Sequence, residues 1–244
     1  MSITMRDSFN KEKGTLVFVR HGESRFNELN VFTGWLDIPL SVKGIQEAHQ
    51  VAEHCKQFSY DAVFTSHLER AHETLLITLA RQKKIGLFDH QSAQRYDVSV
   101  GARPFLADKI IPVYTSRALN ERAYGDLQGM NKTTAAKKYG TARLLKWRRG
   151  FFERPPHGES LQDVYKRVIP YVKKMIISRL KRNETLLLVG HGNTLRAVIK
   201  HIDSISDADI PFVELPFGRP LIYQYSRGRF DRVEGEYDFT RRLR

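Results

Sequence analysis

Leu16-Val-Phe-Val-Arg-His-Gly-Glu-Ser24 is an apolar run that ends in His-Gly, and Leu187-Leu-Val-Gly-His-Gly-Asn-Thr194 repeats this pattern. Runs this short and this apolar are typical of strands that are covered on both faces of a sheet. In an open α/β sheet, the ligand crevice lies beyond the carboxyl ends of the strands. The repeat therefore predicts two buried strands that bring His21 and His191 to the same edge of one sheet.

Strands and helices alternate along the rest of the chain, and this alternation is typical of an α/β fold. We predict a single three-layer α/β/α domain with a mostly parallel central sheet. Strands are expected over residues 15–20, 61–65, 110–114 and 184–189, with a closing strand pair within 220–232. Helices are expected over about 42–57, 67–81, 131–149, 160–182 and 193–202.

Polar residues mark the expected helix starts. Ser41 and Asn131 are suitable N-caps, and Ser66-His-Leu-Glu69 has the spacing of a capping box. Ser160-Leu-Gln-Asp163 opens the longest helix, in which Pro170 is expected to produce a bend.

The catalytic domain is expected to span residues 15–234, between an N-terminal extension (1–14) and a short basic tail (235–244). Residues 82–109 show little periodicity and are too long for an ordinary connection. We interpret this segment as an insertion within the domain.

The composition narrows the class of protein. Of 244 residues, 41% are hydrophobic and 27% are charged, as in globular proteins that bury a sizeable core. No apolar run approaches the ~18 residues that span a bilayer, and the first 14 residues lack the apolar segment of a secretory signal. The single cysteine, Cys55, excludes an internal disulfide and a cysteine-rich metal site. We expect a cytoplasmic protein that does not bind membranes.

The formal charge of +13 favours an anionic partner, either a small substrate with several negative charges or a nucleic acid. The basic residues are spread along the chain, with short clusters only at Arg148-Arg149 and within 241–244. A dedicated nucleic-acid-binding protein more often has a concentrated basic stripe or tail. A small anionic substrate is therefore favoured, and nucleic acid is the remote alternative.

The two histidines suggest phosphoryl transfer. A neutral imidazole can form a labile covalent intermediate with a phosphoryl group, and a second one can stabilise the transferred charge. Arg20 precedes His21, and a guanidinium binds phosphate oxygens with two parallel hydrogen bonds. The glycines that follow, Gly22 and Gly192, are expected to let backbone N–H groups approach a ligand.

Two other interpretations of these histidines remain. A histidine at a strand end is often only structural, although the repeat of the motif argues against this for the pair. A metal site would need further Asp, Glu, His or Cys ligands nearby, and Asp is absent from both motifs. Arg20 would also lie unfavourably beside a dication, so we expect no metal.

His157-Gly158-Glu159-Ser160 has the same letters as the first motif but follows Pro155-Pro156 instead of an apolar run. We interpret it as the entry to a helix.

Arg20-His21-Gly22-Glu23-Ser24 together with Gly190-His191-Gly192-Asn193 resembles the motifs of the histidine phosphatase superfamily. Further blocks between about 15 and 225 resemble the cofactor-dependent phosphoglycerate mutases of that superfamily. They are Phe32-Thr-Gly-Trp35, Leu40-Ser41, Thr65-Ser66 with Arg70-Ala71, Leu119-Asn-Glu-Arg122, Tyr124-Gly125 with Leu127-Gln-Gly129, Asn131-Lys132, Trp147-Arg-Arg-Gly150, Gly158-Glu-Ser160, and Leu215-Pro216 with Gly218 and Pro220.

The resemblance implies a role for each matching residue. His21 would become phosphorylated, Glu121 would donate and accept protons, and His191 would stabilise the transferred phosphoryl group. Arg20 and Arg70 would bind that phosphoryl group. The rest of the pocket is implied to consist of Gly22, Glu23, Ser24, Asn27, Thr33, Gly34, Arg122, Tyr124, Lys132, Arg148, Arg149, Gly192 and Asn193.

The implied activity is that of an isomerase of glycolysis and gluconeogenesis, which interconverts 3-phosphoglycerate and 2-phosphoglycerate through a phosphohistidine. The resemblance also implies priming by 2,3-bisphosphoglycerate and no metal, while a homodimer stays an open alternative. A histidine phosphatase that hydrolyses another small phosphoester would share His21, His191, Arg20 and Arg70. Such an enzyme would not need the Asn-Glu-Arg and Trp-Arg-Arg-Gly blocks.

Overall fold

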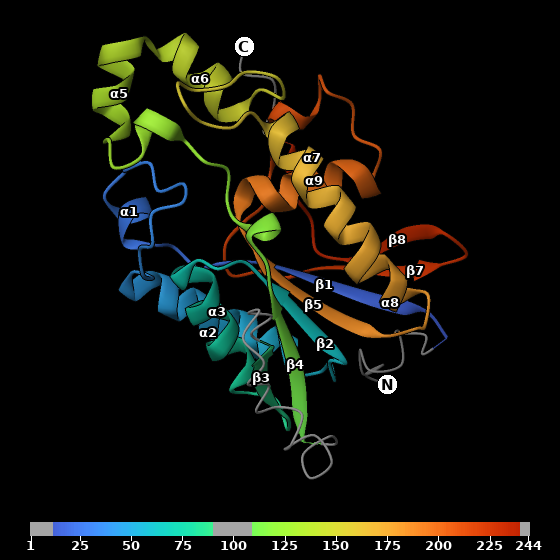
Figure 1. Cartoon of the computed structure of the whole chain (residues 1–244). Coiled ribbons are helices and arrows are strands. Elements are labelled where there is room, and N and C mark those ends of the chain that lie inside the picture. The colour runs from blue at the N-terminus through green and yellow to red at the C-terminus, as the bar shows by residue number, and fades with distance from the viewer. Residues whose placement is uncertain (1–11, 90–108, 240–244) are drawn as a thin grey trace, which may run out of the picture.

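A central sheet of mostly parallel strands runs through the protein (Figure 1). The computed structural model describes residues 12–89 and 109–239. Within these ranges the main sheet has seven strands in the order β3-β4-β2-β5-β1-β7-β8. They are β1 (Gly14–Arg20), β2 (Ala62–Thr65), β3 (Ile85–Asp89), β4 (Ile110–Thr115), β5 (Thr185–Gly190), β7 (Leu221–Ser226) and β8 (Arg229–Glu234). The first five strands in this order are parallel, β7 is antiparallel to β1, and β8 is antiparallel to β7. This mostly parallel sheet confirms the predicted fold class.

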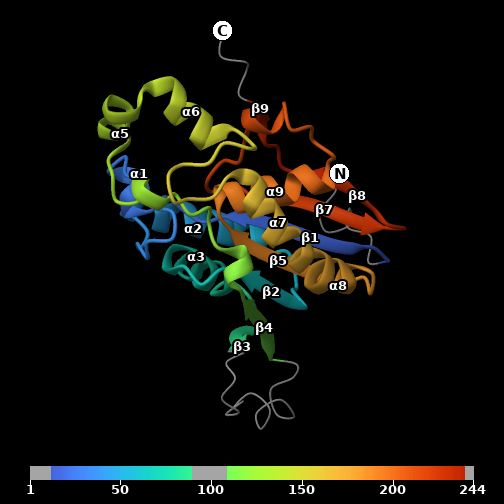
Figure 2. The same ribbon diagram turned by 45° about the horizontal axis from the view of Figure 1, so that its top comes forward.

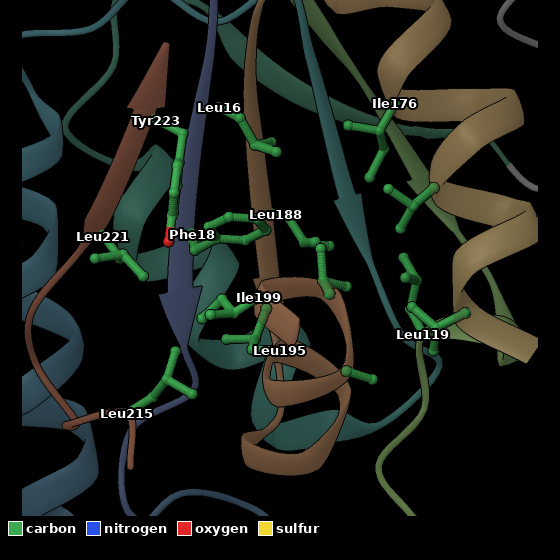
Figure 3. Close-up of a cluster of buried hydrophobic side chains, with 14 of the residues drawn as sticks. Leu16, Phe18, Leu119, Ile176, Leu188, Leu195, Ile199, Leu215, Leu221 and Tyr223 are labelled. Carbon is green, nitrogen blue, oxygen red and sulfur yellow. The ribbon is translucent and has the colours of Figure 1, made fainter. Parts of the chain in front are cut away.

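Helices cover both faces of the sheet because successive side chains of the buried strands point to opposite faces (Figures 1 and 2). Leu16 and Phe18 of β1 pack into one apolar cluster, and Val17 and Val19 pack into another. Figure 3 shows the first cluster, in which Leu195 and Ile199 lie against the strands. The covering helices are α2 (Val42–Cys55) and α3 (Glu69–Leu79) on one face, and α7 (Leu161–Tyr171) and α9 (Gly192–Ile202) on the other.

The long helix expected over 160–182 is present as three consecutive segments. Ser160 caps α7 through a reciprocal pair of hydrogen bonds with Asp163. After Pro170 the backbone winds more widely as the π-helix η4 (Val172–Ile177), and α8 (Ser178–Leu180) completes the element. A proline removes one backbone donor and disturbs the helical ladder, and π turns are one way in which a helix accommodates this.

The helix expected over 131–149 is divided into two helices, α5 (Lys132–Tyr139) and α6 (Thr141–Arg149). The break lies at Gly140, whose φ of 84° is in the left-handed region that favours glycine. Both helices lie at one end of the molecule (Figure 1). They are joined to the body through an apolar cluster of Phe32, Leu127, Ala135 and Leu144.

The expected capping box at Ser66 is wrong. Helix α3 begins at Glu69, and its N-cap residue, Leu68, makes no side-chain cap. The hydroxyl of Ser66 lies instead against His191, which is distant in the sequence. Competition from this long-range contact explains why the local pattern failed.

The expected insertion, 82–109, begins with a strand of the main sheet. β3 pairs with β4 in parallel, so Ile85 to Asp89 are part of the domain core architecture. Residues 90–108 lie outside the described residues, as do the first part of the N-terminal extension and residues 240–244 of the basic tail.

Short elements connect this framework. They are α1 (Arg25–Glu28), η2 (Arg117–Leu119), η3 (Gly125–Leu127), η5 (Ile210–Phe212) and the two-stranded sheet of β6 (Val213–Glu214) and β9 (Asp238–Phe239). Across the described ranges, no helix is long and apolar enough to cross a membrane.

Candidate active site

His21 and His191 lie side by side at the carboxyl ends of two neighbouring strands. β1 and β5 are paired in parallel with Arg20 opposite Gly190, so the residue after each strand is a histidine at the same edge. The centroids of the two imidazole rings are 5.0 Å apart. Both side chains are almost completely buried, at 4% and 0% exposure.

The tautomer of His21 follows from its hydrogen bond. Its Nδ1 lies 2.6 Å from the carbonyl oxygen of Gly22, which can only accept, so Nδ1 carries the proton. The other ring nitrogen, Nε2, then carries the lone pair. Burial lowers the pKa of His21 well below 6.5, and the charges of Arg70 and Arg20 lower it further. His21 is therefore neutral and nucleophilic at neutral pH.

His191 is oriented by Ser66. The hydroxyl of Ser66 lies 2.7 Å from His191 Nε2 and also accepts the backbone N–H of Leu68. When the Ser66 hydroxyl donates its own hydrogen to Nε2, the proton of His191 lies on Nδ1. Nδ1 is buried and has no hydrogen-bond partner among the residues that the structure describes. It is thus a free donor beside His21.

Arg70 is a buried cation held by backbone carbonyls. Its guanidinium donates to the carbonyl oxygens of Leu36 at 3.1 Å and Gly34 at 2.9 Å. Burial lowers its pKa to about 10, while the charges of Glu121 and Asp37 act in the opposite direction. It remains positively charged at neutral pH.

Glu121 faces the same space from the segment after η2. One of its carboxylate oxygens accepts the backbone N–H of Arg122 at 2.7 Å and that of Asn193 at 3.2 Å. Its residue exposure is 9%. These contacts hold a carboxylate close to the two histidines.

These residues surround a cavity of about 140 Å³ whose wall is mainly polar. Six basic side chains line it, from Arg20, Arg70, Lys132, Arg148, Arg149 and Arg196, against two carboxylates, Glu121 and Glu214. Several guanidinium nitrogens nearby, on Arg20, Arg122 and Arg196, are buried without a hydrogen-bond partner among the described residues. A cavity with this imbalance is suited to a small ligand that carries several anionic oxygens.

Most residues that the sequence analysis assigned to the pocket lie around this cavity. They are Arg20, His21, Asn27, Thr33, Gly34, Arg70, Glu121, Tyr124, Lys132, Arg148, Arg149, Gly192 and Asn193. His191 is not among the residues that line the cavity, and the centroid of its ring lies 5.0 Å from that of His21. Arg122 is completely buried beside the cavity, where it donates to the Tyr124 hydroxyl at 2.9 Å and to the Arg148 carbonyl at 2.7 Å.

Gly22, Glu23 and Ser24 do not line the cavity. Their backbone N–H groups are already donated, to the Thr74 hydroxyl, the Glu47 carboxylate and the Asn27 side chain respectively. In this structure the three N–H groups are thus engaged within the protein, and their place in the pocket stays a prediction.

In this structure Gly22 allows two backbones to pack closely, and it does not line the cavity. A Cβ at this position would lie 2.2 Å from the carbonyl oxygen of Gly44 in α2, so only glycine allows the two backbones to approach. Gly192 is different, because a Cβ there would meet the Arg20 guanidinium at an ordinary 3.6 Å. The second glycine alone faces the cavity.

Three residues of this site were not predicted from the sequence, namely Ser66, Arg196 and Glu214. Arg196 donates to the Asn193 side chain at 3.0 Å and to the carbonyl oxygens of Arg149 and Ile210 at 3.0 and 2.6 Å. Its position three residues after Asn193, on the same helix face, was a usable signal. Glu214 offered no local signal, since its contacts come from distant parts of the chain.

Comparisons with known proteins agree with this geometry. The family model of the histidine phosphatase superfamily (branch 1) matches residues 16–89 and 100–234. A protein of Methanosarcina acetivorans named 2,3-bisphosphoglycerate-dependent phosphoglycerate mutase is 43% identical over 238 residues, which cover 91% of this chain and 96% of that protein. A protein of the same name in Gloeothece citriformis is 41% identical over 223 residues, covering 86% of this chain and 93% of its own.

Solved structures with the same fold include a mycobacterial glucosyl-3-phosphoglycerate phosphatase in complex with VO3. It has a TM-score of 0.71 and 23% identity, and the match covers 90% of this chain and 97% of that one. The α-ribazole phosphatase of Shigella flexneri has a TM-score of 0.69 and 21% identity, over 90% of this chain and 94% of its own. At these identities the likeness concerns the fold alone.

Proposed function

Because the chain belongs to branch 1 of the histidine phosphatase superfamily, we propose that it is an isomerase that interconverts 3-phosphoglycerate and 2-phosphoglycerate. Relatives that share about two fifths of its residues over nearly their whole length carry the name of this activity. The observation that carries the proposal is a neutral, desolvated His21 at the floor of a cavity lined with basic side chains.

His21 is the proposed nucleophile. Its Nε2 lone pair attacks the phosphorus atom of a bound phosphate ester, so an N–P bond forms and the ester P–O bond breaks. The hydrogen bond from Nδ1 to the Gly22 carbonyl holds the ring and stabilises the positive charge that develops on it. When the reaction runs in reverse, a substrate hydroxyl oxygen attacks the same phosphorus atom.

Arg20, Arg70 and His191 are proposed to bind the transferred phosphoryl group. Phosphoryl transfer depends mainly on positioning and on neutralising the charge of the equatorial oxygens. Arg70 is fixed by two carbonyls, and the free Nδ1 donor of His191 lies beside His21. Preorganised donors of this kind need little rearrangement during the reaction.

Glu121 is the proposed proton carrier. It gives a proton to the substrate oxygen that leaves the phosphorus atom, and it takes one from the hydroxyl that later attacks phosphohistidine. The N–H groups of Arg122 and Asn193 fix its carboxylate at the edge of the cavity.

The basic residues at the other end of the cavity, Lys132, Arg148 and Arg149, are proposed to hold the second anionic group of the substrate. Priming by 2,3-bisphosphoglycerate would use the same residues, because this molecule also carries a second anionic group that a set of cations can bind. When bound, this molecule supplies the phosphoryl group that first charges His21.

The test is direct observation of the reaction. We would follow 3-phosphoglycerate by phosphorus NMR in excess chelator, with and without trace 2,3-bisphosphoglycerate, and use His21→Ala as the negative control. We expect primer-dependent formation of 2-phosphoglycerate by the wild-type protein only. Release of inorganic phosphate without isomerisation would reassign the chain as a phosphatase, and absence of turnover would contradict both activities.

A further inference from the structure

Glu214 is the one carboxylate of the described cavity wall that the proposed mechanism does not use. It ends β6, and this strand is paired with β9, so that Glu214 lies opposite Asp238. Its carboxylate is ion-paired with Arg149 on α6 and lies 3.6 Å from the guanidinium of Arg20 at the end of β1. A single acidic side chain thus contacts two cations of the cavity wall that come from different elements.

The charge of Glu214 is maintained at neutral pH. Burial alone would raise its pKa, but the hydrogen bond from Arg149 and the positive charges of Arg149, Arg20 and Arg196 hold the pKa below its ordinary value. The carboxylate therefore neutralises two of the cations that the mechanism assigns to the substrate. An incoming anionic group has to compete with it for them.

Glu214 is also placed where it can move. Its side chain is 34% exposed, compared with 17% for Arg20 and 28% for Arg149, so it has access to water when its partners are taken. Leaving a partly buried guanidinium without a counter-ion is unfavourable. If the Glu214 carboxylate moves away when the substrate binds and returns when the substrate dissociates, the guanidinium groups always have an anionic partner.

We propose that Glu214 is an exchangeable counter-ion that occupies, in the free enzyme, part of the binding site of the substrate's second anionic group. It weakens the binding of highly charged ligands, and it pairs with Arg149 and Arg20 while the substrate's two ends exchange places in the cavity. This inference rests on the proposed function, because the exchange of ends is needed only in an isomerase. Glu214 is a specificity-determining residue, since its effect grows with the charge of the ligand.

A purely structural ion pair would behave in the opposite way. If Glu214 only anchored α6 to β6, its removal would loosen Arg149 and weaken anion binding. If Glu214 is an exchangeable counter-ion, its removal should strengthen anion binding. The sign of the change therefore separates the two roles.

The experiment measures anion binding by calorimetry with inorganic phosphate and 2,3-bisphosphoglycerate as probes. The full-length protein and its Glu214 variants carry His21→Ala in this experiment, so that 2,3-bisphosphoglycerate binds without transferring its phosphoryl group. In Glu214→Gln we expect the Kd of 2,3-bisphosphoglycerate to fall about fivefold to tenfold, and that of phosphate to fall less. Glu214→Ala removes the same charge without leaving an amide and should shift both Kd values in the same direction. An unchanged or higher Kd in both variants would overturn the proposal.

Glu53→Gln is the matched control. Glu53 lies on α2, ion-paired with Lys56 and Arg81 outside the cavity, and its substitution makes the same change in net charge. The Kd values of Glu53→Gln should equal those of the protein without this substitution. This result would separate the local effect of the charge at Glu214 from the effect of the net charge of the protein.

Steady-state kinetics of the same Glu214 variant with His21 intact provide the second measurement. In Glu214→Gln we expect KM for 3-phosphoglycerate and kcat to fall together, because ligands bind more tightly and exchange their ends more slowly. If the wild type binds both anions but does not isomerise phosphoglycerate, the proposed function fails while the Kd comparison still decides the role of Glu214. If phosphoglycerate is isomerised and the Kd values do not change in the Glu214 variants, the counter-ion proposal is contradicted while the proposed function is supported.

Discussion

The hydroxyl of Ser66 lies 2.7 Å from Nε2 of His191, although 125 positions separate the two residues in the sequence. The contact arises because β2 and β5 are parallel neighbours that end at the same edge of the sheet. Both groups are completely buried. Ser66 therefore orients the His191 ring, and a hydrogen bond donated by its hydroxyl to Nε2 favours the tautomer with the proton on Nδ1.

Ser66→Ala should slow the reaction without changing the fold. Without the hydroxyl, His191 can adopt the other tautomer, so its free nitrogen is no longer always a donor. We expect kcat to fall about tenfold, as for the loss of one buried hydrogen bond, with KM nearly unchanged. The Tm and kcat of Ser66→Thr, which keeps a hydroxyl, provide the comparison. Equal kcat values for Ala and wild type would rule out this role.

His21→Ala should abolish formation of a phosphoenzyme. The nucleophilic nitrogen is lost and no neighbouring group replaces it, so we expect a fall in activity of more than about 10³-fold. Incubation with labelled 2,3-bisphosphoglycerate, followed by mass spectrometry of acid-labile modifications, would detect the label. The exposed histidine His67 gives the matched control, since His67→Ala should be labelled like the wild type.

The pH profile should report the lowered pKa of His21. The reaction requires neutral His21, whose pKa is lowered well below 6.5, first by burial and then by Arg70 and Arg20. The kcat/KM for 2,3-bisphosphoglycerate, which reacts with the unphosphorylated enzyme, should therefore remain high at pH 6.5 and fall only in more acidic solution.

Arg70→Gln tests the cause of that shift. Removing a neighbouring positive charge makes protonation of His21 easier, so the acid limb of the kcat/KM profile should move to higher pH. A limb that stays in place, or moves to lower pH, would contradict the assignment of the limb to His21. The reduced activity of the variant does not affect this reading, because the position of the limb is measured and not its height.

The fold was predictable because its decisive elements are local. The apolar runs of β1 and β5 identify buried strands, and the histidine after each run identifies the edge where the site lies. The helix break at Gly140 and the strand β3 were not predicted, because the spacing of apolar residues along the sequence indicates them only weakly. Gly140 is one residue in a long helical pattern, and β3 is a short edge strand with mostly half-buried residues.

The parts of the site that were missed depend on contacts between distant segments. The local sequence around Ser66 has the pattern of a helix cap, and only the pairing of β2 with β5 directs this residue to His191 instead. Glu214 meets Arg149 only because η5 and α6 pack together, and one sequence contains no trace of that contact. Long-range electrostatic partners of this kind require the three-dimensional structure.

Gly22→Ala should destabilise the protein through a clash of backbones. The new Cβ would lie 2.2 Å from the carbonyl oxygen of Gly44, and neither backbone can move without disturbing His21 or α2. We expect a loss of about 1–3 kcal/mol in the free energy of unfolding, measured by denaturant titration. Gly190→Ala is the control, because its Cβ would meet only the flexible Leu195 side chain at 3.2 Å. A similar loss in both variants would show that backbone contact is not the cause.

Arg196 is expected to support substrate binding from beneath the cavity. Its guanidinium connects the Asn193 side chain to the carbonyl oxygens of Arg149 and Ile210, and the residue is 4% exposed. Arg196→Met leaves these acceptors without this donor, so the end of α6 that carries Arg148 and Arg149 loses one of its attachments.

The change should appear mainly in KM. We expect KM for 3-phosphoglycerate to rise about tenfold in Arg196→Met, with a smaller fall in kcat, because the cations of the second anionic site are displaced while His21 and Glu121 keep their own contacts. Arg196→Lys restores the charge but not the planar donor arrangement, so it should recover only part of the affinity. If kcat fell and KM did not change, Arg196 would act on the chemical step instead, through Asn193 and the N–H group that Asn193 donates to Glu121.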